Sequence, residues 1–322
     1  MKISITAILV LGSLLTACSS KQPDWVDKPT GQYPPKRYLS AVGEADDRST
    51  ADDRALANLA KIFEVAISDR SLDFSQAQVS GDQSGRDVSN IQAASRYVTT
   101  EAKQVLEGAQ LVESWQDDEG NAYSLAVLEK APATRRFRDA VRSADREIED
   151  RVNYASQRAP NPVVALAALE QARKIETQRS NLNRNLTVVR GRGIKAPYDQ
   201  ASLQKLLSNA LATLHFSAEA VSPELQQSLE SAIGTLGITL DQQAPYLLIA
   251  SMDTEPVQQK QGWYWLRGST QLSLMFQGET LAKKRWPLKV SAMDKGMVEQ
   301  RAKDKLSEQM TVYLYELITS VQ

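Results

Sequence analysis

The pattern of apolar and polar positions in the first half of the chain predicts one helix among short strands. Tyr38–Gly43 is a short apolar run that ends in glycine, which indicates a strand. Residues 56–63 are apolar at helical spacing. Residues 65–68 favour a second strand, and residues 109–115 and 123–128 flank a turn as in a β-hairpin. This order predicts a helix packed on an antiparallel sheet.

Two stretches between these elements have weaker patterns. Residues 69–95 are rich in Ser, Gln, Asp and Gly, so the sequence leaves open a loop or a pair of strands. Residues 96–104 fit a helix or a strand equally well.

The middle of the chain reads as two long helices separated by a break at Pro160-Asn161-Pro162. Apolar residues recur every three or four positions on both sides of this break. We therefore predict a helical hairpin over residues 132–190. Its apolar stripes are either a partner surface or the seam by which the helices pack, and we favour the seam.

The last third of the chain mixes both periodicities. Helical spacing covers residues 203–214, 225–236 and 298–317. Strands are predicted at residues 215–217, 246–252, 263–267, 271–276 and 285–291. We predict a second α+β domain, with antiparallel strands and helices on one face.

The N-terminus has the organisation of a signal peptide. Lys2 precedes a short apolar run over residues 3–15, which is too short to span a bilayer permanently. The junction Leu15-Thr16-Ala17-Cys18 resembles a bacterial lipobox, which implies cleavage before Cys18 and three acyl chains on that residue. Two or more chains anchor a protein stably to a membrane. The resemblance also implies that Ser19, in place of an aspartate, directs the protein to the outer membrane.

These segments predict an α+β chain of two helix-on-antiparallel-sheet domains joined by a long helical hairpin. The expected boundaries are a signal peptide (1–17), a lipidated cysteine with a flexible, proline-rich tether (18–36), an α+β domain (37–131), the hairpin (132–190) and a C-terminal α+β domain (197–322). Within the tether, Trp25 either packs on the first domain or lies at the lipid interface, and we favour packing.

Three motifs carry a family resemblance. Pro23-Asp24-Trp25-Val26, the strand Tyr38–Glu44 and an alanine-containing helix that reaches Asn58-Leu59-Ala60 resemble the Lpp-twenty lipoprotein family, over about residues 23–130. The resemblance implies an envelope lipoprotein with a helix-on-sheet domain. Some members are surface antigens and others are accessory proteins of the flagellar basal body, so no enzymatic activity is implied.

Composition narrows the function classes. The formal net charge is −1, which gives no basis for a nucleic-acid partner. Cys18 is the single cysteine, so the body folds without disulfides. We expect no cofactor, and the oligomeric state is left open.

The polar motifs do not assemble into a catalytic or metal-binding pattern. His215 is the single histidine and fits a packed or helix-end position. Asp46-Asp47 and Asp52-Asp53 fit helix-end charges, and Asp117-Asp118-Glu119 fits a hairpin turn. Arg190–Gly193 lacks the spacing of a phosphate-binding loop. We predict no catalytic residues, no metal site and no enzymatic activity.

The aromatic run Trp263-Tyr264-Trp265 is the one candidate binding motif. On a strand, Trp263 and Trp265 share a face, and Tyr264 lies opposite with Leu266. The cluster is either a surface for a partner protein or glycan, or part of a core between domains. The core is the favoured interpretation, because large aromatic side chains are mostly buried.

The sequence therefore predicts a non-enzymatic outer-membrane lipoprotein that faces the periplasm. We expect the lipid on Cys18 to attach it to the membrane and its domains to bind envelope proteins. The expected role is a binding or assembly scaffold for an envelope machine such as the flagellar basal body. The alternative is a lipoprotein regulator of a peptidoglycan synthase, with residues 197–322 as the effector domain.

Overall fold

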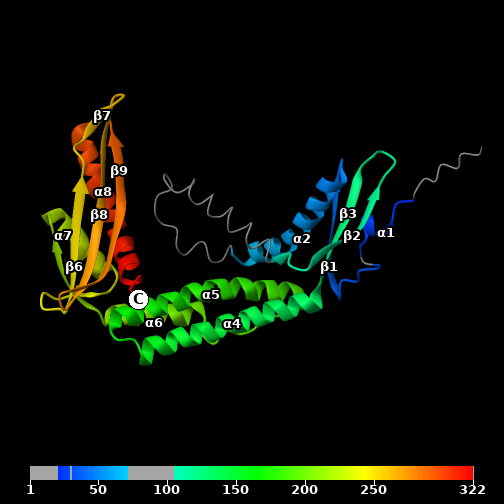
Figure 1. Cartoon of the computed structure of the whole chain (residues 1–322), viewed down its shortest axis with the longest axis horizontal. Helices are drawn as coiled ribbons and strands as arrows, with labels where there is room; N and C mark the ends of the chain where they lie inside the picture. Colours follow the sequence, from blue (N-terminus) through cyan, green and yellow to red (C-terminus); the bar gives the residue numbers. More distant parts are fainter. Residues whose placement is uncertain (1–20, 30, 72–104, 322) are drawn as a thin grey trace, which may run out of the picture. The chain divides into compact units, whose positions relative to one another are not determined.

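The computed structural model describes residues 21–29, 31–71 and 105–321, and gives the backbone alone for residues 64–71 (Figure 1). The predicted signal peptide, Cys18 and residues 72–104 lie outside the described residues. The chain divides into two compact units, one of Met1–Phe137 with Arg184–Gly193, the other of Arg138–Asn183 with Ile194–Gln322. Both contain helices and a β-sheet, which confirms the predicted α+β class.

The first unit contains a three-stranded antiparallel sheet covered by a helix. The sheet order is β1-β3-β2, so β3 is central. Its elements are β1 (Tyr38–Ala45), β2 (Ala109–Gln116) and β3 (Ala122–Glu129), with α2 (Arg48–Ser71) against β1 and β3. The β-hairpin predicted from residues 109–115 and 123–128 is present as β2 and β3. In its turn, the Asp117 carboxylate accepts a hydrogen bond from the Asn121 N–H at 2.8 Å. Helix α2 begins after Asp47, whose Oδ1 accepts the Thr50 N–H at 3.0 Å.

The strand predicted at residues 65–68 is wrong, because these residues belong to α2. The β-branched residues Val65 and Ile67 favour a strand by propensity. A helix that has already formed adds residues at little cost, so this weak local preference is overridden.

Gly43 allows β1 and α2 to approach closely. A Cβ atom at this position would lie 2.2 Å from both the Ala51 carbonyl oxygen and the Ala55 nitrogen. Both atoms belong to the helix backbone and cannot move away as a side chain could. The Val42-Gly43-Glu44 motif therefore fixes the distance between strand and helix.

The second face of this sheet is covered by the segment before β1. Ser124 bonds to Asp52 of α2, so the next residue, Leu125, points to the opposite face, yet it is fully buried. Helix α1 (Asp24–Asp27) lies against β3, with Trp25 half-buried. Tyr33 packs edge-to-face on Tyr38, with ring centroids 5.4 Å apart. This part of the predicted tether is therefore packed on the sheet and is not extended.

Two long helices cross from the first unit into the second. They are α4 (Lys130–Gln157) and α5 (Pro162–Arg190). Within the second unit, Arg179 Nε of α5 forms an ion pair of 2.7 Å with Asp145 Oδ1 of α4. Ile148 of α4 shares an apolar core with Leu166 of α5.

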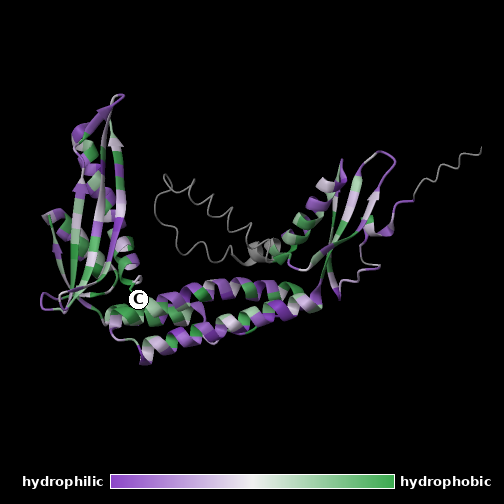
Figure 2. Cartoon of the chain, in the orientation of Figure 1, coloured by the Kyte–Doolittle hydropathy of each residue, from purple (hydrophilic) through white to green (hydrophobic). Residues whose placement is uncertain are grey.

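The second unit contains a six-stranded mixed sheet with order β5-β4-β6-β8-β7, and β9 pairs with the other edge of β8. Strands carry hydrophobic and hydrophilic residues in turn (Figure 2). The strands are β4 (His215–Ala220), β5 (Thr239–Leu240), β6 (Tyr246–Thr254), β7 (Gln258–Lys260), β8 (Trp263–Phe276) and β9 (Glu279–Ala292); the helices are α6 (Gln200–Ala212), α7 (Pro223–Thr235) and α8 (Lys295–Ile318). Helices α7 and α8 contact the sheet.

Two details of this sheet differ from the sequence prediction. Strand β4 is parallel to β5 and β6, not antiparallel, because α7 carries the chain back as a crossover between β4 and its neighbours. The strands predicted at 263–267 and 271–276 are one continuous strand, β8. Gly268 lies between the two predicted strands and pairs with Thr254 of β6. A Cβ atom at position 268 would lie 2.2 Å from the Asp253 carbonyl oxygen, so the backbones of β6 and β8 approach closely here.

Candidate functional site

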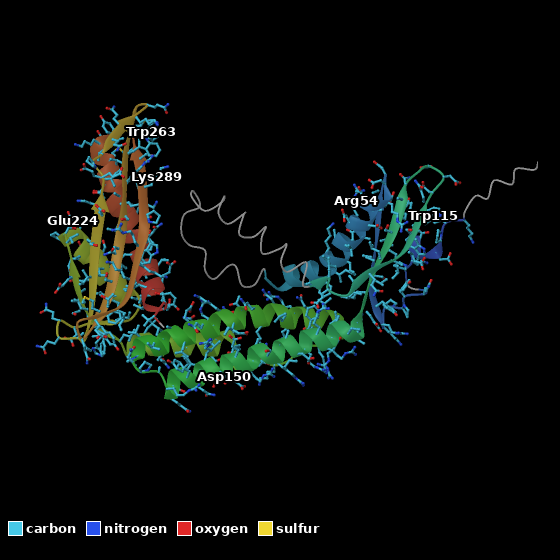
Figure 3. All side chains as sticks on the ribbon, in the orientation of Figure 1. Arg54, Trp115, Asp150, Glu224, Trp263 and Lys289 are labelled. Carbon is cyan, nitrogen blue, oxygen red and sulfur yellow. The ribbon has the colours of Figure 1, made fainter. Side chains whose placement is uncertain are left out.

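The aromatic run begins β8 and is divided between the two faces of the sheet. Tyr264 and Leu266 point toward α8, where Leu266 lies in a small core with Val298 and Ala302. Trp263 and Trp265 therefore point to the opposite, outward face. Trp263 is 37% exposed, and Figure 3 shows it near the β7 end of the sheet, with Lys289 on the neighbouring strand.

Four cations share the outward face of β8 and β9 with these two tryptophans. Arg267 is paired with Lys289 across β8 and β9, and Lys289 Nζ lies 5.2 Å from the centre of the Trp265 ring. Arg285 and Lys283 follow on β9 at every second position, so they share this face. All four cations are exposed, and none forms an ion pair with the described residues. We call Trp263, Trp265, Arg267, Lys283, Arg285 and Lys289 the outward patch.

A groove of about 460 Å³ opens beside the outward patch. It crosses β8 at Gly268 and is lined by residues of both charge signs and by Ser269. Asp253 and Glu255 are its acidic residues, and Arg267 and Lys289 are its basic residues. The groove can therefore offer hydrogen-bond acceptors and charged donors to one ligand.

The free edge of β9 is less accessible than its face. Arg301 Nη1 of α8 donates to the Ser291 carbonyl oxygen at 2.6 Å, and Lys305 Nζ reaches the Lys289 carbonyl oxygen at 3.4 Å. Pro287 has no N–H to offer a further strand. These features disfavour the addition of a strand at this edge.

The other residues singled out from the sequence lie apart from this patch. His215 is exposed at the start of β4. Asp47 and Asp117 accept hydrogen bonds at a helix start and in a turn, which lowers the pKa of each carboxyl. Gly191 ends α5 with φ +81°, as expected of a C-terminal glycine cap. The described residues contain no cluster of His, Cys, Asp and Glu that could hold a metal ion.

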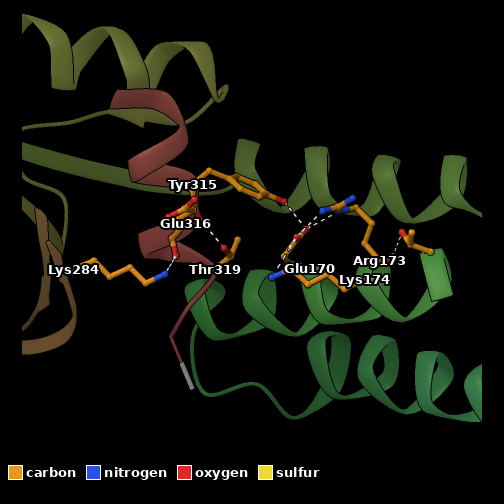
Figure 4. Close-up of polar contacts among 8 residues, drawn as sticks. Glu170, Arg173, Lys174, Lys284, Tyr315, Glu316 and Thr319 are labelled. Carbon is orange, nitrogen blue, oxygen red and sulfur yellow. Dashed lines mark hydrogen bonds and ion pairs between the residues drawn. The ribbon is translucent and has the colours of Figure 1, made fainter. Parts of the chain in front are cut away.

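The second unit contains a buried polar cluster that the sequence did not predict (Figure 4). Arg173 binds both oxygens of the Glu170 carboxylate at 2.7 Å, and Tyr315 Oη donates to Oε2 at 2.7 Å. Burial raises the pKa of the Glu170 carboxyl, but the hydrogen bonds from Arg173 and Tyr315 outweigh burial and bring the pKa below its usual value. A glutamate inside the apolar stripe of α5 was the signal that could have revealed this cluster.

The first unit combines the three features that carried the family resemblance. A strand with a close-approach glycine, a helix against it and a packed Pro-Asp-Trp segment all occur together. Residues 23–129 match the LPP20 lipoprotein family. The resemblance to the Lpp-twenty (LPP20) family is thereby confirmed over this region. The outward patch lies outside the LPP20 region, so the family match does not assign it a role.

Solved structures that are similar to this chain include the following three. One is a secreted protein from the human pathogen Helicobacter pylori, with 13% identity, a TM-score of 0.45, and coverage of 86% of this chain and 97% of that chain. The second is a minor lipoprotein from Acinetobacter baumannii, with 16% identity, a TM-score of 0.28, and coverage of 32% of this chain and 90% of that chain. The third is a candidate lipoprotein from Caulobacter crescentus, with 15% identity, a TM-score of 0.26, and coverage of 35% of this chain and 92% of that chain.

No curated protein matches the chain. Among the helices of the described residues, none combines the length and the apolar character needed to cross a membrane.

Proposed function

We propose that this chain is a lipid-anchored, non-enzymatic envelope protein that holds an envelope component through the outward patch. Two features support attachment to the membrane through a lipid: the lipobox at Leu15–Cys18 and the match of the adjoining region to a lipoprotein family. The lipid on Cys18 attaches the chain to the outer membrane, and the folded units face the periplasm. The protein acts by position, as a scaffold.

The observation that carries the binding role is the composition of the outward patch. A sheet face normally hides its large aromatic side chains, but Trp263 is 37% exposed. Four cations lie on the same sheet face as the tryptophans, Lys289 against the Trp265 ring, and none has an ion-pair partner in the described part of the chain. Exposed aromatic residues beside unpaired arginine and lysine are typical of binding surfaces.

The family resemblance favours a scaffold role in an envelope machine such as the flagellar basal body. A second candidate is regulation of a peptidoglycan synthase. This alternative is supported by the position of the outward patch, which lies in residues 197–322 and not in the LPP20 region. The two candidates differ in the protein that should lie next to Trp263 in the cell.

Site-specific photo-crosslinking tests the binding role. Benzoylphenylalanine replaces Trp263 in the chain with Cys18 intact, and crosslinked products from living cells are identified by mass spectrometry. Gln227, exposed on α7, is the control position. Adducts with basal-body components at position 263 alone support the machine, and adducts with a synthase support the regulator. Identical products from both positions, or none from position 263, would contradict the binding role.

Metabolic labelling with palmitate tests lipid attachment at Cys18 separately from binding. The wild-type chain should take up label and sediment with the outer membrane. Cys18→Ser should lose both properties while the body still folds, because Cys18 precedes the described residues. Label retained in Cys18→Ser would show that the anchor lies elsewhere.

A further inference from the structure

We propose that the outward patch and its groove bind a glycan that carries free carboxylates, the chemistry found in peptidoglycan. This inference rests on the proposed function, since it names what the binding surface holds. The anchored chain would then connect the outer membrane to the cell wall.

The tryptophans supply the platform that a sugar ring requires. Sugar rings present flat patches of C–H groups, which pack against the face of an aromatic ring that is partly solvent-exposed. Trp263 and Trp265 lie two residues apart on one strand, so their side chains are about 7 Å apart along the sheet. The third tryptophan of the second unit, Trp286, is different: it faces α8, its ring stacks on that of Tyr313 with centroids 4.4 Å apart, and its Nε1 donates to Glu316 at 2.9 Å.

The cations supply the charge that carboxylates require. Lys283, Arg285 and Lys289 follow one another along a single strand over about 20 Å, at roughly 3.4 Å per residue. A line of charges of this length suits an extended ligand with repeated carboxylates better than a single small anion. The whole chain has a formal net charge of −1, so this basic surface is a local feature and not a consequence of composition.

The groove argues against an anionic bilayer as the ligand. Asp253 and Glu255 line it next to Arg267 and Lys289. Carboxylates at this point repel anionic headgroups, whereas they accept hydrogen bonds from the hydroxyl and ammonium groups of a cell-wall polymer. The covered edge of β9 argues against a peptide that adds as a further strand.

Co-sedimentation with isolated peptidoglycan sacculi tests the proposal, using the full lipidated protein in detergent. The charge-neutral variant is K283Q/R285Q/K289Q. The matched control, K205Q/K295Q/K303Q, removes the same charge from exposed lysines on α6 and α8. We expect wild type and control to sediment alike and the patch variant to bind at least tenfold more weakly. W263A should also weaken binding, with circular dichroism confirming that each variant is folded.

Three outcomes would overturn the inference: no sedimentation of the wild type, equal loss in the patch and control variants, or stronger binding to phosphatidylglycerol vesicles than to sacculi. Chitin, an uncharged glycan, should bind at least tenfold more weakly than sacculi, and equal binding would overturn the role of carboxylates. If sacculi fail while position 263 still crosslinks an envelope protein, the glycan inference fails and the proposed function stands. If both fail, the binding surface itself is wrong.

Discussion

The Tyr315 hydroxyl donates a 2.7 Å hydrogen bond to Glu170 Oε2 and so ties α8 to α5. The Glu170 side chain is 3% exposed, and Arg173 neutralises it through two bonds of 2.7 Å. A buried carboxylate is tolerated only when its oxygens are satisfied. The last helix of the chain is therefore held to α5 by a specific polar contact in addition to apolar packing.

Tyr315→Phe should destabilise the second unit by about 1–3 kcal/mol, because a hydrogen bond to a buried charge is lost. Urea unfolding monitored by circular dichroism measures this loss. Tyr154→Phe is the control, because its hydroxyl forms no hydrogen bond within the described residues. Equal destabilisation by both substitutions would show that the ring environment matters and the hydroxyl does not.

Glu176→Gln should stabilise the protein at pH 8 and have little effect near pH 4.5. Burial raises the pKa of the Glu176 carboxyl above 4.5, with the Ser180 hydrogen bond of 2.9 Å opposing it. Its Oε2 has no hydrogen-bond partner in the described structure. A raised pKa in the folded state means that stability is full at low pH and falls as the pH rises through that pKa, where the buried group must ionise.

Urea midpoints at several pH values check this dependence. Glu299→Gln, an exposed substitution on α8, serves as the reference. A stabilisation by Glu176→Gln that stayed constant between pH 4.5 and 8 would rule out ionisation as its cause.

Gly43→Ala should disrupt the LPP20 region. The new Cβ atom would lie 2.2 Å from backbone atoms of Ala51 and Ala55, so β1 and α2 must separate. We expect a loss of about 3 kcal/mol or more, the range of severe overpacking. Thermal unfolding and limited proteolysis of the full chain measure it, with Gly31→Ala as control, because a Cβ atom there meets nothing within 4 Å. Near-wild-type stability of Gly43→Ala would refute the close approach.

The double substitution R301A/K305A should promote self-association through β9. It removes the donors that cover the Ser291 and Lys289 carbonyl oxygens at the strand edge. Sedimentation velocity at increasing protein concentration should show dimers or larger species. Lys303→Ala, which removes only an exposed ion pair with Glu224, should remain like the wild type. An unchanged sedimentation profile for R301A/K305A would mean that Pro287 protects the edge without help.

The sequence was informative where side-chain periodicity decides the structure. Alternation along residues 263–266 separated the tryptophans from Tyr264 and Leu266 correctly, because successive strand residues point to opposite faces. Periodicity could not show which face is open, since that depends on which face α8 covers, and α8 follows only after the whole of β9. It also could not show the direction of β4 relative to β6, because pairing is set by the crossover through α7.

Buried charges were the least predictable feature. Glu170 and its partner Tyr315 are separated by most of the second unit, and only the folded chain brings them together. Residues 65–68 illustrate the opposite error, in which a local strand preference was given too much weight against the continuation of a helix.

The packing of α1 and Tyr33 on the LPP20 sheet sets a limit on reach. An extended chain spans at most about 3.5 Å per residue, so the roughly six residues from Cys18 to Asp24 cover about 20 Å. A lipid on Cys18 would therefore keep Asp24, at the start of α1, within about 20 Å of the bilayer surface. Contact with structures farther from the bilayer would then require the rest of the chain. A longer segment before Asp24 would relax this limit without altering the fold of either unit.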